Sequence, residues 1–396
     1  MIFQKKYTIF AKELKQLNHL IMQKKIKWMF AVLFLFSAIM AWGQEEGEQF
    51  SVATLNVDGL PQKILVLKVN PDGPGDAGTA RIGKYLLQKK YDLMMLQEDF
   101  NFHDVLTVFL EDDYKFDTWS GNVGTDGHKI DFLHLQNHRF ECDGLLACWR
   151  NDLTVTPSVR MAWKQNFGKF SHANDEMVTK GFRCYEVTLR GGTRIVVFNM
   201  HMDASDDADE VAKNDSKDKE ARMAQWQQLK EEVLQQLDTR PILIMGDMNS
   251  LYGRDNVKGE FIDAINASGR GTIADVWVEM EQHGTYPDDQ AKGVADGETL
   301  DKILYINPVE GTKIQPVAFS IDRDGYLYNG KPLGDHYPVA ATFKVVSNID
   351  AIEEVENNQS GDYPLYYNLN GQRISQPRRG MYIRQSAGKT DKHIVK

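Results

Sequence analysis

The sequence predicts a mixed α/β domain, and two observations lead to that fold class. From about Phe50 onward, short segments rich in β-formers alternate with amphipathic helical segments. The chain also has 396 residues, of which 42% are hydrophobic and 26% are charged, so it can bury a large core. A third feature bears on function, because most of the predicted strands are bordered by Asn, Asp, Glu or His.

The predicted elements follow in chain order. Helices are expected at 78–90 and 219–237, where apolar residues recur at helical spacing. Alternating or continuous apolar runs predict strands at 50–57, 91–99, 143–150, 182–189, 193–202, 240–250, 302–307 and 337–345.

The first 43 residues predict a secretory signal peptide. Lys24, Lys25 and Lys27 precede the apolar run WMFAVLFLFSAIMAWG, which ends at small residues and is followed by an acidic stretch. Because the run is short for a bilayer, a retained anchor is the less favoured alternative. Translation is expected to begin at Met22, and the mature protein to be periplasmic, on the cell surface or secreted.

Charge and cysteine content narrow the class of protein. Without residues 1–43 the chain carries 39 basic and 55 acidic side chains, a net charge of −16. Stable nucleic-acid binding is therefore disfavoured, since its affinity draws on Lys and Arg at phosphates. Three cysteines allow at most one disulfide, and buried apolar cysteine is the favoured interpretation.

The composition changes again near the C-terminus. Residues 347–363 are polar and acidic and predict a linker, and residues 364–396 predict short strands joined by Asn-Gly and Arg-Gly turns. This small β-module resembles the C-terminal sorting modules of proteins exported by the type IX pathway. An appended β-module without a sorting role is the alternative.

Polar residues at the strand ends form the candidate site. Any one of them is commonly a cap or a turn residue, but together they predict a single polar rim. Carboxylate and amide oxygens with few lysines suit a hard cation such as Mg²⁺, with Mn²⁺ as a substitute. The rim residues are Asn56, Glu98, His201, Asp247, Asn249, Asp301, Asp335 and His336.

Six motifs in this order resemble the endonuclease/exonuclease/phosphatase superfamily: NVDG, QED, NMHMDA, GDMNS, LDKILY and GDHYPV. The resemblance spans roughly Phe50 to Val345, and the catalytic domain is expected at residues 44–346. It implies a catalytic domain with the deoxyribonuclease I-like fold, in which two packed mixed sheets are flanked by helices as a four-layer sandwich. It also implies a magnesium-dependent hydrolase of phosphoric esters, here expected to be a monomer.

The resemblance implies a metal set and a phosphate set. Glu98 matches the principal magnesium ligand, with Asn56 beside it and Asp335 as a secondary metal or orienting acid. His201 matches a phosphate-contacting histidine.

The remaining matches concern water and protons. Asp247 matches the residue that orients the attacking water, with Asn249 as its partner. His336 is then the general base or the donor to the transition state, and Asp301 matches the carboxylate that fixes its tautomer. A single in-line displacement by water is expected.

The substrate stays open at this stage. A phospholipid or sphingomyelin-type phosphodiester at a membrane surface is favoured, because the segments NMHMDASDDAD and GFRCYEVTLRGG look closest to extracytoplasmic phosphodiesterases. A secreted nuclease, an inositol-phosphate phosphatase and a non-catalytic surface binding module are the alternatives. Aromatic residues between 116 and 182 either complete the core, which is favoured, or meet lipid. Lys180 and Arg183 are the nearest basic candidates for a phosphate contact, and ordinary surface charge is the alternative for both.

Overall fold

The computed structural model describes residues 47–64, 67–120, 135–136, 139–140, 142–168, 172–205, 216–287 and 297–346, together with short strands between 365 and 395. The chain divides into two compact units, Met1–Val345 and Val346–Lys396. The predicted signal peptide and linker lie outside the described residues. Within the described part, none of the helices has the length and apolar character needed to cross a membrane.

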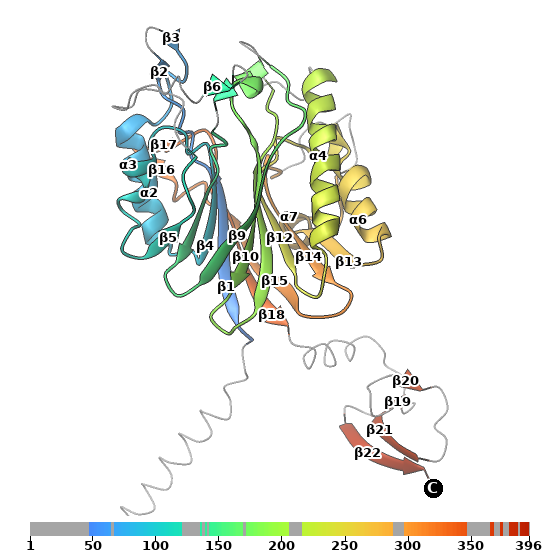
Figure 1. Ribbon diagram of the computed structural model, residues 1–396. Coiled ribbons are helices and arrows are strands. Elements are labelled where there is room, and N and C mark those ends of the chain that lie inside the picture. Colours follow the sequence, from blue (N-terminus) through green and yellow to red (C-terminus); the bar gives the residue numbers. More distant parts are fainter. Residues whose placement is uncertain are drawn as a thin grey trace, which may run out of the picture. The chain divides into compact units, whose positions relative to one another are not determined.

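Two six-stranded sheets form the large unit (Figure 1). In sheet 1 the strand order is β15-β18-β1-β4-β8-β5, with β1 and β4 parallel. In sheet 2 it is β13-β14-β12-β11-β10-β9, with β11 and β12 parallel. Sheet 1 contains β1 (Gln49–Asn56), β4 (Leu93–Gln97), β5 (Tyr114–Phe116), β8 (Leu146–Arg150), β15 (Lys313–Ile321) and β18 (Val339–Val346). Sheet 2 contains β9 (Thr154–Ala162), β10 (Gly181–Thr188), β11 (Arg194–His201), β12 (Ile242–Asp247), β13 (Gly271–Asp275) and β14 (Asp301–Pro308).

Helices cover the outer faces of both sheets (Figure 1). Against sheet 1 lies α2 (Gly75–Lys89), whose Ile82 and Leu86 pack on Leu55 and Met94. Against sheet 2 lies α4 (Ser216–Gln236), whose Trp226 is buried in a cluster with Phe198 and Ile244 of that sheet. The smaller helices are α3 (His103–Thr107), η2 (His172–Met177), α5 (Tyr252–Asp255), η3 (Lys258–Ile262), α6 (Asp263–Ala267) and α7 (Val276–Glu281).

A third apolar cluster lies between the two sheets. It joins Val52 and Phe343 of sheet 1 to Val197 and Leu243 of sheet 2. The large unit thus has four layers, helix, sheet, sheet and helix, and an apolar core fills each boundary between them. The four-layer α/β sandwich expected from the sequence is confirmed. The three cysteines are free and buried, as expected for apolar core residues.

Four strands of the two six-stranded sheets were missed by the sequence prediction, and all four are edge strands: β5, β9, β13 and β15. β9 and β15 each contain a proline, Pro157 and Pro316. Proline removes a backbone donor, so within a sheet it is found at edges, where one side of the strand needs no partner. Both strands have long runs of half-exposed residues, which hid them from a search for buried segments.

Short hairpins complete the large unit: β2 (Lys63–Ile64) with β3 (Leu67–Lys68), β6 (Leu135–Gln136) with β7 (Arg139–Phe140), and β16 (Leu327–Tyr328) with β17 (Lys331–Pro332). The small unit is a four-stranded sheet in the order β20-β19-β21-β22, which confirms the predicted C-terminal β-module. Its strands are β19 (Leu365–Tyr367), β20 (Arg373–Ile374), β21 (Gly380–Ser386) and β22 (Lys389–Val395).

Candidate active site

The site is the polar end of the core between the sheets. Residues two apart in a strand face the same side, and the inward residues of five strands change from apolar to polar toward the same end. The five series are Val52, Thr54 and Asn56; Leu93, Met95 and Gln97; Val197, Asn199 and His201; Leu243, Met245 and Asp247; and Tyr305, Ile303 and Asp301.

Strand register sets three of these side chains in a row. His201 is the partner of Asp247 across β11 and β12, and Asp247 is the partner of Asp301 across β12 and β14. Side chains directly opposite each other on neighbouring strands lie about 5 Å apart at Cβ. The ladder of sheet 2 therefore delivers two carboxylates and an imidazole to one place.

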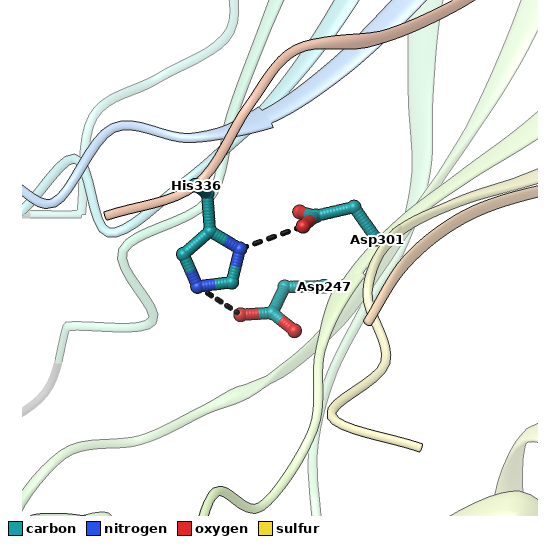
Figure 2. Close-up of side chains that lie close together, drawn as sticks. All are labelled: Asp247, Asp301 and His336. Atoms are coloured by element: carbon teal, nitrogen blue, oxygen red, sulfur yellow. Dashed lines mark hydrogen bonds and ion pairs between the residues drawn. The ribbon is translucent and has the colours of Figure 1, made fainter. Parts of the chain in front are cut away.

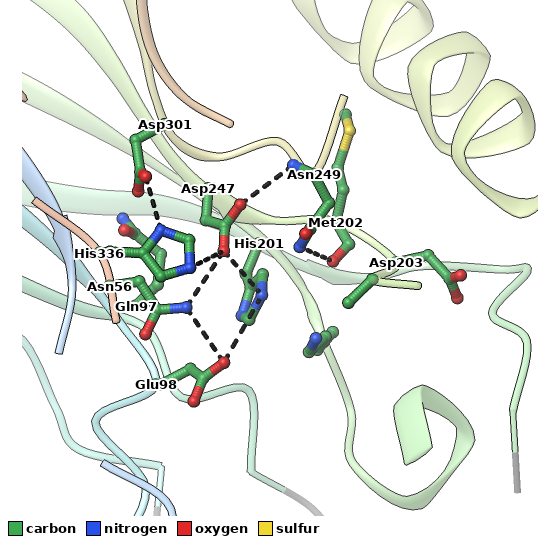
Figure 3. A network of polar contacts seen from close by, with 12 residues as sticks. Asn56, Gln97, Glu98, His201, Met202, Asp203, Asp247, Asn249, Asp301 and His336 are labelled. Carbon is green, nitrogen blue, oxygen red and sulfur yellow. Dashed lines mark hydrogen bonds and ion pairs between the residues drawn. The ribbon is translucent and has the colours of Figure 1, made fainter. Parts of the chain in front are cut away.

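Asp247 is the centre of the network (Figure 3). Its Oδ2 accepts a hydrogen bond from Asn56 Nδ2 at 3.1 Å and lies 3.3 Å from His201 Nε2. Its Oδ1 accepts from the backbone N–H of Asn249 at 3.0 Å. Burial opposes the charge of this carboxylate, but the two facing histidines, His336 and His201, outweigh burial and hold its pKa below the usual value.

His336 and Asp301 form a tight pair (Figure 2). His336 Nδ1 lies 2.6 Å from Asp301 Oδ2, and His336 Nε2 lies 3.6 Å from Asp247 Oδ2. Burial alone would lower the pKa of His336, but Asp301 and Asp247 raise it well above its usual value. With Nδ1 bonded to Asp301, it is Nε2 that faces the polar rim.

Sheet 1 contributes Glu98 and Asn56 to the rim. Asn56 Nδ2 donates to Glu98 Oε1 at 3.0 Å as well as to Asp247, so one amide joins the two sheets. Glu98 directly follows β4 and has a left-handed backbone with φ 59°. A side chain in that region costs about 1 to 3 kcal/mol, and such residues concentrate at functional sites. The carbonyl of Glu98 also lies 2.2 Å from where a Cβ of Gly59 would stand, which requires glycine there.

Asp58 is a rim residue that the predicted metal set omitted. Its side chain is nearly buried, and its pKa is raised to about 8 by burial and then by the facing carboxylates of Asp335 and Glu98. Asn70 Nδ2 donates to it. The signal was present in the sequence, because Asp58 follows Asn56 at an interval of two in the motif NVDG.

These acids fit a hard divalent cation. Three carboxylates, those of Asp58, Glu98 and Asp335, repel one another, and a cation among them would relieve that repulsion. Oxygen donors without cysteine favour Mg²⁺ or Mn²⁺ over zinc. Asp247, Asp301 and His336 are also close enough to share an ion. In that trio Asp301 Oδ2 and His336 Nδ1 already face each other at 2.6 Å, and Asp301 Oδ1 is buried without a hydrogen-bond partner among the described residues. The carboxylate group of Asp58, Glu98 and Asp335 fits a cation better, because none of its members is paired with an imidazole nitrogen at hydrogen-bond distance.

The two remaining predicted residues also lie at the rim. Asn249 Nδ2 donates to the carbonyl of Met202 at 3.1 Å, which holds the loop after β12 against the end of β11. His201 is buried, and its Nδ1 has no hydrogen-bond partner among the described residues. The structure thus brings together seven of the eight predicted side chains by direct contacts. Asp335 joins them through charge alone, and the roles of all eight stay predictions.

Several polar residues from the same motifs do not join the site. Asp99 turns away from Glu98 and pairs with His103, with 2.6 Å between Asp99 Oδ2 and His103 Nδ1. Asp203 accepts from the backbone of Phe167 at 2.7 Å and is not part of the rim.

The two basic candidates are both buried and paired with carboxylates. Arg183 is buried and saturated, because it binds Asp143 through two nitrogens and Asp117 through a third. It is a structural residue and offers no donor to a phosphate. Lys180 is buried and paired with Asp175, within the electrostatic field of Glu98 and Asp247.

Two of the aromatic residues between 116 and 182 complete the core. Trp149 and Trp163 are buried in the cores on either side of sheet 2, while Trp119 is half-buried against His103. Phe167 is half-buried, and Phe170 lies outside the described residues. The core interpretation therefore holds for the two buried tryptophans.

Comparisons with known proteins address the fold. No protein-family model matches the sequence, and no curated protein matches it either. Among solved structures, the chain is similar to D. rerio TDP2 complexed with a single-strand DNA product, at 14% identity and a TM-score of 0.47 over 75% of this chain and 99% of that one.

Two bacterial structures are similar to the same extent. A beta toxin from Staphylococcus aureus is 16% identical, with a TM-score of 0.44 over 74% of this chain and 99% of that one. An endonuclease/exonuclease/phosphatase from Bacteroides vulgatus is 12% identical, with a TM-score of 0.45 over 76% of this chain and 100% of that one. Similarities of this size assign no chemistry, so the function follows from the side chains of the site.

Proposed function

We propose that the protein is a metal-dependent phosphoesterase that hydrolyses a phosphodiester by direct attack of water. The observation that carries this proposal is the convergence of His336, His201 and Asp247 beside a group of mutually repelling carboxylates. Hydrolysis forms a phosphorus–oxygen bond to water and breaks the one to the leaving group, giving a phosphomonoester and an alcohol.

The chain's own residues divide this chemistry. Asp247, kept ionised by the histidines, accepts a hydrogen bond from the attacking water and orients it. His336, held by Asp301, donates from Nε2 to the phosphoryl group, and His201 contacts the phosphate from the other side. Mg²⁺ bound near Glu98 would polarise a phosphoryl oxygen and lower the pKa of its water.

We further propose that the substrate is a phospholipid or sphingomyelin-type phosphodiester at a membrane surface, hydrolysed by an exported monomer. The hairpin β16–β17 supports this, because it lies a few residues before His336 and exposes Leu327 and Tyr328 at 39% and 49%. Asn329 and Gly330 form its tip, both with positive φ. Apolar side chains at such a tip, beside Lys331, suit an interface between hydrocarbon and phosphate.

Purified protein offered several substrates tests both levels of the proposal. We expect headgroup release from vesicles of sphingomyelin or phosphatidylcholine with Mg²⁺, and none with EDTA. Cleavage of DNA without lipid hydrolysis would select the nuclease alternative, and release of inorganic phosphate from inositol phosphates would select the phosphatase. If every substrate stays intact with Mg²⁺, the enzyme proposal fails.

The hairpin has its own test. The double variant Leu327→Ser and Tyr328→Ser should lose activity on vesicles but keep it on a small water-soluble phosphodiester. Val317→Ser is the matched control, since Val317 is equally exposed but lies on the edge strand β15. Equal activity of all three proteins on vesicles would contradict a role of the hairpin at the membrane.

A further inference from the structure

Between the apolar core and the site lies one layer of buried polar side chains. It consists of Thr54 on β1, Gln97 on β4 and Asn199 on β11, all fully buried, and is called here the amide layer. Each member precedes a rim residue: Thr54 precedes Asn56 by two positions, Gln97 precedes Glu98 by one, and Asn199 precedes His201 by two. The amide layer therefore lies directly beneath the rim residues, between them and the apolar core.

Asn199 belongs to sheet 2, but the hydrogen bonds of its side chain all go to sheet 1. Its Nδ2 donates to the backbone carbonyls of Leu96 at 3.1 Å and Leu146 at 3.2 Å. Leu96 and Leu146 are the last paired residues of β4 and β8. The side chain of Asn199 thus hydrogen-bonds to sheet 1 at the point where the pairing of β4 and β8 ends.

Gln97, on β4 of sheet 1, forms a further hydrogen bond between the two sheets. Its Nε2 donates to Asn199 Oδ1 at 2.8 Å and to the carbonyl of Met95 at 3.0 Å. Its Oε1 lies 3.3 Å from the hydroxyl of Thr54, which donates to it. With these contacts, both hydrogens and the oxygen of each amide have partners, as buried polar groups require.

The amide layer differs from the core beneath it in one physical respect. Apolar side chains such as Val197 and Met245 hold the sheets together without fixing direction, because the hydrophobic effect is not directional. Hydrogen bonds prescribe distance and angle. The layer therefore sets how far apart the sheets lie at the place where ligands from both must meet.

We propose that Gln97 and Asn199 are positioning residues, which hold Glu98 and Asn56 of sheet 1 at the separation from His201 and Asp247 of sheet 2 that metal binding and turnover require. The inference rests on the proposed function. It assigns the two amides no contact with substrate or metal. They act through the backbone of the residues that follow them.

The test compares Gln97→Met with the matched control Val197→Ala. Methionine keeps the length of glutamine but removes its hydrogen bonds, whereas Val197→Ala loosens the apolar core two residues from Asn199 on the same strand. Three quantities are measured for each protein: the melting temperature without metal, the dissociation constant for Mn²⁺ by calorimetry, and kcat and KM on bis(p-nitrophenyl) phosphate.

We expect Gln97→Met to weaken Mn²⁺ binding and to lower kcat by about 10- to 100-fold each, the range typical of residues that orient metal ligands. KM should stay unchanged, since no substrate contact is lost. Val197→Ala should lose as much or more in melting temperature while keeping the Mn²⁺ affinity and kcat of the wild type.

Two further variants keep the inference testable if Gln97→Met does not fold. Thr54→Val removes one hydroxyl from the layer at constant volume and should show the same changes at smaller size, whereas Thr54→Ser, which keeps the hydroxyl, should restore wild-type values. Wild-type Mn²⁺ affinity and kcat in both Gln97→Met and Thr54→Val would overturn the inference, as would equal losses in Val197→Ala. A wild type that neither binds Mn²⁺ nor hydrolyses the diester would instead overturn the proposed function, and the inference with it.

Discussion

Two Asp–His pairs in this protein have the same local geometry and different surroundings. His336 with Asp301, and His103 with Asp99, each place Nδ1 2.6 Å from a carboxylate oxygen. Both imidazoles are exposed to the same small extent, 16%, over a buried aspartate. In both pairs the carboxylate outweighs burial and raises the pKa of the histidine.

The pairs differ in what surrounds the other side of the ring. His336 Nε2 faces Asp247 and the polar rim. The ring of His103 is stacked on Trp119, with centroids 5.0 Å apart, and the indole N–H of Trp119 donates to the carbonyl of Asp99. An Asp–His pair is therefore no evidence of catalysis by itself. The groups that converge on its second nitrogen distinguish a site from a structural contact.

The largest contrast is expected from the two aspartates. Asp301→Asn should lower kcat about 100-fold or more, because an amide no longer fixes the tautomer or supports the charge of His336. Asp99→Asn should leave kcat unchanged while the free energy of unfolding falls by about 1 to 3 kcal/mol, as a buried bond is lost. Steady-state kinetics and urea unfolding of both variants measure kcat and the free energy of unfolding. Comparable losses of kcat in the two variants would mean that the Asp301–His336 pair is no more important for turnover than the Asp99–His103 pair.

A middle-sized effect is expected at the carboxylate group beside His336. Asp58→Asn should weaken Mg²⁺ binding about 10-fold, since one of three facing carboxylates is lost. Without metal it should raise the melting temperature near about pH 9, above the raised pKa of about 8, because Asp58 is fully charged only there, so that the substitution relieves its repulsion. Calorimetry and thermal unfolding test both signs. Asp104→Asn, beside His103, is the control and should leave Mg²⁺ affinity unchanged. Stronger Mg²⁺ binding by Asp58→Asn would place the cation elsewhere.

The smallest effect concerns pH and the structural pair. The pKa of His103 is raised in the folded state, so its stabilising contribution is complete below about pH 6.5, the unfolded value, and is lost as pH rises through the folded value. The gap in melting temperature between wild type and His103→Gln should thus be larger near about pH 6 than near about pH 9. A gap that widens at alkaline pH would mean that Asp99 does not support a charged His103.

Much of the fold could be predicted because its interior strands contain continuous apolar runs, such as 242–245, that end at polar residues such as Asp247. The rim could be predicted for the same reason: strand register carries the end of each run to one edge. Residues beyond a strand end could not be placed this way. Asp99 leaves the rim because Glu98, just before it, has a left-handed backbone, and Asp203 lies beyond the end of β11 at His201. No spacing rule in the sequence records either feature.

The positive charge of a residue in the sequence did not predict whether it could contact a phosphate. The carboxylates that surround it in the folded protein decided that. Arg183 and Lys180 looked alike as phosphate contacts in sequence, yet Arg183 is saturated by Asp143 and Asp117, which come from segments far away in the chain. The amide layer was equally hidden, since Gln97 and Asn199 meet only when the two sheets pack. Contacts between sheets carry no signature along one strand.

The most direct test of the account is the turnover of one small phosphodiester with Mg²⁺ by the wild type, His336→Ala and His103→Ala. The account predicts that His336→Ala loses about 10²- to 10⁴-fold in kcat, the range for removal of a positioned proton donor or acceptor. His103→Ala, at equal protein stability, should keep the kcat of the wild type. An active His336→Ala, or an equal loss in both variants, would contradict the assignment of the site.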